Sequence, residues 1–305
     1  MLFKLPLFLR LPLAALSVLI NTLAHTTPLF FFAFLKWLVP LKGFRLFCDA
    51  LLIGLAESWI ARNSDLIALF TPTRIEIEGL EGLDRQGHYL VLANHQSWVD
   101  IPVLQHALNR RIPFLRFFLK SQLIWVPVLG LAWWALDFPF MKRYTKSELA
   151  RNPALAGKDM EATRKACEKF RGLPVSIMNF VEGTRFTAEK HRRQSSPFAH
   201  LLKPKAGGVA FVIGAMGDSL QGIVDVAIAY PQGRPTMMDL MAGRLRQVRM
   251  SVRPRAIPAE FLAGDYENDR AFRARFQQWM NAVWQDKDAE LGRLLAGSNE
   301  ENKQR

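Results

Sequence analysis

Residues 11–35 form a run of 25 residues without a single Asp, Glu, Lys or Arg. About 20 apolar residues are enough to cross the hydrocarbon core of a bilayer as an α-helix. The run is too long for a secretory signal peptide, and no small-residue cleavage site with a polar mature start follows it. His25, two threonines and Pro28 fall in the middle of the run. We therefore expect either a kinked transmembrane helix or two half-helices that enter one leaflet.

A second apolar stretch covers residues 46–61 and follows three basic residues that come soon after the first run. It contains Asp49 and Glu57, so its pattern fits an amphipathic helix on the membrane surface or the second arm of a helical hairpin. A core helix of the main domain is the alternative interpretation. Residues 1–70 are thus expected to anchor the chain in a membrane. The basic residues on the two sides of the first run lean slightly toward a cytoplasmic C-terminal side.

The composition of the chain fits a membrane partner. The formal net charge is +13, which suits nucleic acid, an anionic membrane surface or phosphorylated substrates. The apolar N-terminal region favours the membrane, because basic residues near anionic lipid gain about 1 kcal/mol each. Cys48 and Cys167 are far apart in the sequence and do not predict a disulfide framework.

From residue 71 to residue 290 the sequence alternates between strand and helix patterns. The segment "TRIEIEG" alternates as a half-buried strand does, and "HYLVLAN" is a continuous apolar strand of the kind buried on both faces. Strands alternating with helices predict an α/β domain over residues 71–290. Residues 291–305 are expected to be a polar tail, disordered after Gly297. Further strands are expected in "IPFLRFFLK", "DFPFMKRY", "PVSIMNF", "GIVDVAIAYP" and "RLRQVRMSVRP", and helices over residues 99–108, 158–171 and 270–284 and in "PKAGGVAFVIGAM".

Three polar clusters follow predicted strands. In open α/β sheets the ligand crevice lies outside the carboxyl ends of the strands. One polar turn means little, whereas three at the same edge of a sheet indicate a site. The clusters are Asn94-His95 with Asp100, then Lys142-Arg143, then Glu182-Gly183-Thr184-Arg185.

His95 and Asp100 are five residues apart, and on a regular helix such residues point about 140° from each other. They can meet only if the helix begins after His95. Ser97 is a good N-cap residue, which would make Trp98 the first helical residue and leave His95 in the preceding turn. The spacing Ser-x-x-Asp also fits a capping box, in which Asp100 only accepts a backbone N–H. The residues around His95 leave both interpretations open.

A functional pair would make His95 a general base, with Asp100 fixing its tautomer and stabilising the imidazolium ion. No G-x-S-x-G elbow occurs, so the hydroxyl to be deprotonated is expected to be the substrate's own. Arg185 and Arg143 are candidates for binding phosphate through a bidentate guanidinium. The alternative for Arg185 is a surface ion pair with Glu182. The basic run over residues 185–205 is either a solvated face or a surface for phosphate groups, and the Cys and His spacing predicts no metal site.

Together these motifs resemble those of the glycerolipid acyltransferases typified by 1-acyl-glycerol-3-phosphate acyltransferase. The family motif Asn-His-x4-Asp matches "NHQSWVD", and Phe-Pro-Glu-Gly-Thr-Arg matches "FVEGTR". A strand ending in Arg resembles "FPFMKR", and an apolar strand ending in Pro resembles "VAIAYP". Order and spacing agree over residues 89–231, and the fuller pattern is similar to a subgroup of bacterial inner-membrane acyltransferases. Val181 replaces the usual Pro, which changes the rigidity of the turn more than the chemistry. The Gly that usually opens the second motif is missing, and this second departure bears on the identity of the acceptor.

The resemblance implies transfer of a fatty acyl group from acyl-CoA or acyl carrier protein to the sn-2 hydroxyl of 1-acyl-glycerol-3-phosphate. The product would be phosphatidic acid, formed by direct attack without an acyl-enzyme and without a cofactor. The implied fold is α/β with a mixed central sheet flanked by helices, preceded by a membrane-embedded helical segment. The implied general base is His95, with Asp100 as its partner. The implied acceptor-binding residues are Asn94, Arg143, Glu182, Gly183, Thr184 and Arg185.

The expected partners are a lysophospholipid acceptor, the acyl donor and anionic membrane lipid. The resemblance implies a bacterial inner membrane, with the active site on its cytoplasmic side. One alternative keeps the chemistry but changes the acceptor to another lysophospholipid or an aminoacyl lipid. Another alternative is a membrane-anchored basic protein that binds RNA or a different acidic partner. An intact His95 and Asp100 speak against it, because a binding protein needs no base, and no nucleic acid is expected.

Overall fold

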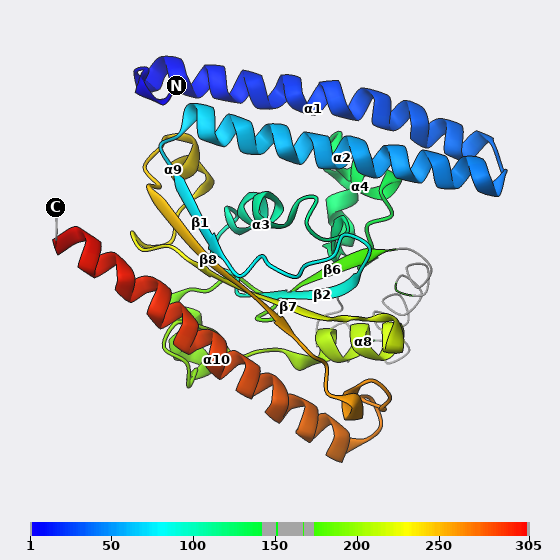
Figure 1. Ribbon diagram of the computed structural model, residues 1–305, viewed down its shortest axis with the longest axis vertical. Helices are drawn as coiled ribbons and strands as arrows, with labels where there is room; N and C mark the ends of the chain where they lie inside the picture. The colour runs from blue at the N-terminus through cyan, green and yellow to red at the C-terminus, as the bar shows by residue number, and fades with distance from the viewer. Residues whose placement is uncertain (1, 142–150, 152–166, 168–173, 304–305) are drawn as a thin grey trace.

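The computed structural model describes residues 2–141, 151, 167 and 174–303 (Figure 1). Within these residues the chain forms an N-terminal helical hairpin, a six-stranded sheet and helices on both faces of that sheet. Arg143, its neighbour Lys142 and the helix predicted over residues 158–171 lie outside the described residues.

The hairpin consists of α1, Leu7–Leu38, and α2, Lys42–Phe70. The prediction of two half-helices is wrong, because α1 is one helix that contains both Pro12 and Pro28. Packing along the length of α2 explains how one helix accommodates two prolines, since tertiary contacts routinely override local propensity. By length and composition α1 could cross a membrane, which weakly suggests membrane association.

Helix α2 lies between α1 and the rest of the molecule (Figure 1). Leu52, Ala56 and Ile60 of α2 are buried in the same apolar cluster as residues of the sheet. The sequence left two alternatives for residues 46–61, the second arm of a hairpin or a core helix. Helix α2 is both. One face of α2 packs on α1, and another packs on α3, Asp100–Leu108.

The sheet has the order β1-β8-β7-β2-β6-β3 and is mixed, as predicted. Strands β2, β3, β6 and β7 run parallel, β8 runs antiparallel to β7, and β1 runs parallel to β8. The carboxyl ends of β7, β2 and β6 therefore meet at one edge. The strands are β1, Arg74–Glu78; β2, His88–Ala93; β3, Leu115–Phe117; β6, Val175–Phe180; β7, Gly222–Ala229; and β8, Gln247–Arg255.

Strand β2 is buried on both faces, because successive side chains of a strand point to opposite sides. Val91 and Ala93 join the apolar cluster under α2 and α3, whereas Leu90 and Leu92 join a second cluster under α8 and α10. A continuous apolar run is the pattern expected of such a central strand. The covering helices are α3, Asp100–Leu108, and α4, Leu129–Ala135, on one face, and α8, Ala206–Met216, and α10, Arg270–Lys303, on the other.

The strand predicted in "IPFLRFFLK" is interrupted. β3 joins the main sheet, whereas β4, Leu119–Lys120, pairs with β5, Phe140–Met141, in a separate two-stranded sheet. Two short helices were not predicted: α7, Ala188–Gln194, in the basic run, and α9, Met237–Met241, after β7. Short 3-10 helices are η1, Leu2–Lys4; η2, Ser121–Trp125; η4, Gly217–Ser219; and η5, Ala259–Phe261.

Helix α10 extends far past its predicted end. The expectation of disorder after residue 297 is wrong for the backbone, which stays helical to Lys303. The buried face of α10 continues beyond Trp284 through Leu291 and Leu294. Lys287 lies on the same face and is also buried. Because this residue is charged, it interrupts the helical spacing of apolar residues that would otherwise predict a longer helix.

Candidate active site

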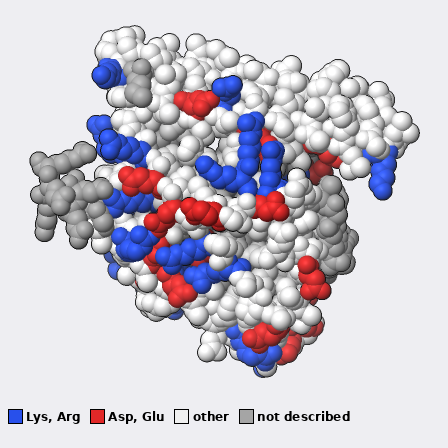
Figure 2. Space-filling model, in the orientation of Figure 1, with Lys and Arg blue, Asp and Glu red and all other residues white. Residues whose placement is uncertain are grey.

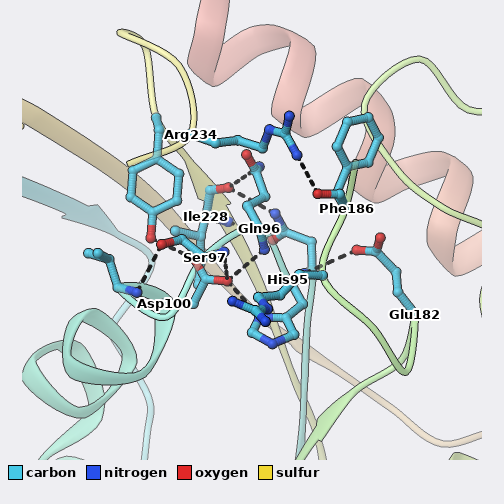
Figure 3. A network of polar contacts seen from close by, with 12 residues as sticks. His95, Gln96, Ser97, Asp100, Glu182, Phe186, Ile228 and Arg234 are labelled. Carbon is cyan, nitrogen blue, oxygen red and sulfur yellow. Dashed lines mark hydrogen bonds and ion pairs between the residues drawn. The ribbon is translucent and has the colours of Figure 1, made fainter. Parts of the chain in front are cut away.

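His95 and Asp100 meet just beyond the carboxyl end of β2 (Figure 3). His95 Nδ1 lies 2.8 Å from Asp100 Oδ2, and the His95 side chain is 15% exposed whereas that of Asp100 is fully buried. Helix α3 begins at Asp100, two residues later than the start predicted at Trp98. His95 therefore lies in the turn before the helix, from which its ring can reach the first helical residue.

The Asp100 carboxylate is saturated with donors. Its Oδ2 accepts the backbone N–H groups of Gln96, at 2.6 Å, and Ser97, at 2.9 Å, in addition to His95 Nδ1. Its Oδ1 accepts the hydroxyl of Tyr230 at 2.6 Å. Capping and pairing with His95 thus occur together, because one carboxylate fixes the turn and holds the imidazole. An oxygen that accepts all three N–H groups makes Nδ1 the protonated nitrogen and leaves Nε2 with a lone pair.

Two aromatic residues complete the environment of the His95–Asp100 pair, and the sequence analysis missed both. Burial and the neighbouring Asp100 charge raise the pKa of Tyr230 well above its ordinary value, so its hydroxyl remains a donor. The ring of Phe180 stacks on His95 with centroids 3.9 Å apart. Phe180 ends β6 and Tyr230 follows β7, and the position at a strand end is the signal that singled out His95 as well.

Asn94 is fully buried and joins two strands. Its Nδ2 donates to Ile228 O at 2.9 Å, and its Oδ1 accepts Ile228 N–H at 2.9 Å. Both polar groups of the side chain are therefore used within the protein. These contacts tie the end of β2 to β7, and acceptor binding by Asn94 stays a prediction.

Glu182 is also fully buried, beyond the end of β6. Its Oε1 accepts His95 N–H and its Oε2 accepts Leu202 N–H, each at 3.1 Å. Burial raises its pKa to about 8 against the lowering effect of these two N–H groups, and the Asp100 charge adds to the rise. The surface ion pair with Arg185 is wrong, because the carboxyl is inside the protein. The contacts are those of a residue that positions the His95 backbone, and contact with an acceptor stays a prediction.

The other residues of the "EGTR" turn shape the loop after β6. Gly183 has a φ of +66°, and a Cβ there would lie 3.1 Å from the Lys205 side chain, so this position favours glycine. Thr184 Oγ1 accepts Lys190 Nζ at 2.7 Å, and the same ammonium donates to Arg185 O at 3.0 Å. The turn therefore holds its backbone in place and leaves the Arg185 side chain exposed.

A pocket of about 380 Å³ opens beside the His95 turn. The Arg185 guanidinium lies over the Trp98 ring at 4.8 Å from its centroid and forms one side of the pocket. Within the described residues, no group of three or more His, Cys, Asp or Glu is arranged to hold a metal ion. The pocket is lined by Gln96, Ser97, Trp98, Arg185, Arg234, Pro235, Thr236 and Met237.

Residues 74–230, just over half of the chain, match the sequence model of the family described as Acyltransferase. This chain belongs to the acyltransferase family. The match begins at the first strand of the sheet and ends at Tyr230, so it includes His95, Asp100 and Glu182.

Curated relatives point to glycerolipid chemistry. The acyltransferase is 26% identical over 214 residues to "1-acyl-sn-glycerol-3-phosphate acyltransferase gamma" of Mus musculus, which covers 66% of this chain and 52% of that protein. It is 26% identical over 255 residues to "Lysocardiolipin acyltransferase 1" of Danio rerio, covering 79% of this chain and 61% of that protein. The chain thus spans only about half to three-fifths of the length of these relatives.

A solved structure has the same fold. The acyltransferase is similar to the 1-acyl-sn-glycerophosphate acyltransferase PlsC from Thermotoga maritima, with a TM-score of 0.54 and 19% identity. The likeness covers 94% of this chain and 98% of the other. It confirms the predicted α/β fold with a mixed central sheet, and it extends over the N-terminal hairpin.

Proposed function

We propose that this acyltransferase moves a fatty acyl group from acyl-CoA or acyl carrier protein to the sn-2 hydroxyl of 1-acyl-glycerol-3-phosphate. The observation that carries the proposal is the 2.8 Å contact between His95 Nδ1 and Asp100 Oδ2, at the carboxyl edge of the sheet. A glycerol hydroxyl needs a base at the moment of attack, and an imidazole held in one tautomer supplies it. Relatives with lysophosphatidate acyltransferase names support this acceptor.

In the proposed step the acceptor hydroxyl oxygen attacks the carbonyl carbon of the thioester while His95 Nε2 takes the hydroxyl proton. The tetrahedral intermediate then collapses, the C–S bond breaks, and the leaving thiolate takes the proton from the imidazolium ion. The products are an ester and a free thiol, and His95 is neutral again. Asp100 stabilises the imidazolium ion during the reaction, and no acyl-enzyme forms.

Phosphate recognition is assigned in this proposal to Arg185, which is exposed beside the His95 turn. A guanidinium binds phosphate with two parallel hydrogen bonds, and stacking on Trp98 limits the orientations of the side chain. Arg143 is the second predicted phosphate ligand. Glu182 is proposed as a positioning residue, because its carboxyl oxygens accept the N–H groups of His95 and Leu202.

A panel of substrates tests this function. Membranes containing the overproduced protein are given labelled acyl-CoA or acyl carrier protein with lysophosphatidate, lysophosphatidylglycerol or lysocardiolipin, beside membranes from cells with an empty vector. We expect labelled phosphatidic acid above the vector background. Turnover of lysocardiolipin alone would favour the second candidate acceptor, which the name of the Danio rerio relative supports. No transfer to any lysolipid would contradict the proposal.

Membrane binding is proposed to occur through α1 lying along the surface of the membrane. The Arg10 guanidinium donates to Ala242 O at 2.5 Å, Asn21 Nδ2 donates to Asn63 Oδ1 at 2.9 Å, and Lys36 Nζ lies 3.2 Å from an Asp137 carboxylate oxygen. These contacts attach both ends and the middle of a helix that is about 48 Å long to the rest of the molecule. Such a helix cannot cross the bilayer while the sheet stays on one side.

The outer face of α1 carries the apolar side chains that would enter the lipid. The upper band of Figure 2, where α1 lies, is almost free of charged side chains, whereas charges of both signs intermingle lower down. Amphipathic helices of this kind lie in the interfacial plane of a membrane. The most exposed of the large apolar side chains of α1 are Phe8, Leu16, Leu19, Ile20, Phe31, Phe34, Trp37 and Leu38.

Epitope tags at the two ends of the chain test the orientation of α1. In sealed vesicles, we expect a protease added outside to remove both tags or neither, because both ends lie on the same side. Removal of one tag only would show that α1 crosses the membrane. The protein is expected to stay with the vesicles at high salt, since apolar contacts are not screened.

A further inference from the structure

The pocket beside His95 holds two guanidinium groups, only one of which belongs to the "EGTR" turn. The second is Arg234, which follows β7 and is exposed. The hydroxyl groups of Ser97 and Thr236 donate within the protein, to Pro235 O and to an Asp239 carboxylate oxygen, and no acidic side chain is among the pocket's lining residues. A pocket with two positive charges and no negative one favours a ligand with more than one negative charge.

Arg234 is attached to the loop that carries Arg185. A nitrogen of its guanidinium donates to Phe186 O, and the guanidinium lies over the Phe186 ring, 5.4 Å from its centroid (Figure 3). Because Phe186 follows Arg185 directly, these contacts hold the two guanidinium-bearing segments side by side. A guanidinium has five N–H donors, so one bond to a carbonyl leaves the others for a ligand.

The same contacts join the pocket to His95. Phe186 N–H donates to His95 O at 2.7 Å, and Ser97 Oγ donates to Pro235 O at 2.5 Å. The loops after β2, β6 and β7 are thus connected by hydrogen bonds, and the pocket lies at a fixed position relative to the imidazole. A group bound in the pocket would therefore be held at a fixed place beside the turn that carries His95, which is what positioning a substrate requires.

We infer that Arg234 and Arg185 together bind the phosphomonoester of the acceptor, and that Arg234 selects it over phosphodiester lipids. The inference rests on the proposed function. A phosphomonoester carries a charge of about −1.5 to −2 at pH 7 with three terminal oxygens, whereas a phosphodiester carries a single charge. Two guanidinium groups match the charge of a phosphomonoester and can donate to all three of its terminal oxygens. Trp98 and Met237 give the pocket an apolar side for the rest of the lipid.

Kinetics of Arg234→Gln test the inference, with Arg246→Gln as the matched control. Arg246 is exposed at the same edge of the sheet, immediately before β8, and does not line the pocket. For Arg234→Gln we expect the KM for lysophosphatidate to rise at least about tenfold, with kcat within about threefold of wild type. The inhibition constant of lysophosphatidylglycerol as a competing lipid should change by less than about threefold. Arg246→Gln should match wild type in each constant.

The inference is overturned if Arg234→Gln and Arg246→Gln have the same KM for lysophosphatidate. It is also overturned if Arg234→Gln raises this KM and the inhibition constant of lysophosphatidylglycerol by the same factor. A wild type inactive with lysophosphatidate would contradict the proposed function instead. The pocket is then tested by calorimetric titration of lysophosphatidate in detergent micelles without donor. Weaker binding of lysophosphatidate by Arg234→Gln than by Arg246→Gln would support phosphate binding by Arg234, and equal binding would overturn it. Equal melting temperatures of the two variants would show that the fold is intact.

Discussion

Two aspartates are buried in different surroundings, one within the sheet and one at its carboxyl edge, and their partners differ. Asp225 lies within β7, and its carboxylate contacts Lys287 Nζ and Arg255 Nε, the latter at 2.7 Å. Asp100 lies at the carboxyl edge, and its ion-pair partner within the described residues is His95. The charge of Asp225 is permanently neutralised, whereas the charge of Asp100 is matched only when His95 takes a proton. The first arrangement serves stability, and the second leaves a charge for the reaction.

The largest effect is expected from Asp100→Asn. An Asn can keep the hydrogen bonds, because its oxygen accepts the three N–H groups and its amide donates to Tyr230 Oη. The negative charge that stabilises the imidazolium ion is lost. We expect kcat to fall by about 10²–10⁴-fold with little change in the melting temperature, measured by acyl transfer and by calorimetry. If kcat and the melting temperature fell together, Asp100 would have a structural role like that of Asp225.

Lys287→Met should give the opposite result. Burial lowers the pKa of Lys287 against the raising effect of Asp225, and its ammonium also donates to Leu92 O and Val226 O. Removing one partner of a buried pair leaves an incompletely compensated charge, at a cost of about 3 kcal/mol. We expect a lower free energy of unfolding in urea, with an unchanged rate per folded molecule. A lower rate per folded molecule would contradict the claim that the Asp225 ion pair serves stability alone.

Glu182→Gln tests the residue that braces the His95 backbone. Burial raises the pKa of Glu182 from its ordinary value of 4.5 to about 8, so the native state keeps a proton that the unfolded state loses between these pH values. Wild-type stability should therefore fall as the pH rises from 4.5 to 8. Glu182→Gln should show a flatter profile, with a loss of about 1–3 kcal/mol at pH 5 because its amide faces a backbone N–H. Parallel profiles of melting temperature against pH would contradict the buried, protonated carboxyl.

The smallest effect is expected from Tyr230→Phe. The change removes the donor to Asp100 Oδ1 and leaves the three N–H donors to Oδ2 in place. A single hydrogen bond to a charged group contributes about 1.5–3 kcal/mol, part of which the remaining donors offset. We expect kcat to fall about tenfold, with KM for the acceptor unchanged. A larger loss than that of Asp100→Asn would mean that Tyr230 acts on the substrate directly.

Local pattern predicted much of the molecule. The continuous apolar run of β2 and the polar turns after β2 and β6 were enough to place His95 and Glu182 at one edge of the sheet. Phe180 and Tyr230 also stand at strand ends, but the order β7-β2-β6, which brings them beside His95, joins strands that are distant in the sequence and does not follow from any local pattern. Burial of Glu182 was missed for the same reason, since the covering Leu202 segment comes from elsewhere in the chain.

The errors at the two ends of the chain also have a physical cause. His25 was interpreted as part of an interruption of the apolar run, whereas in α1 its ring hydrogen-bonds to Ser58 of α2. The helix predicted over residues 270–284 stopped short of Lys287, whereas α10 continues past it and Asp225 neutralises Lys287 inside the protein. In both places a polar residue looked like a boundary because its partner is distant in the sequence. Partner residues of this kind are visible only once the chain is folded.

The central claim is that His95 removes the proton from the acceptor hydroxyl. The most direct test is the rate of acyl transfer to lysophosphatidate by His95→Ala, normalised to the folded fraction and compared with Lys287→Met. The account predicts a fall in kcat/KM of about 10³-fold for His95→Ala with its melting temperature preserved, and an unchanged rate per folded molecule for Lys287→Met. A His95→Ala enzyme that keeps more than about a tenth of wild-type kcat/KM would contradict it.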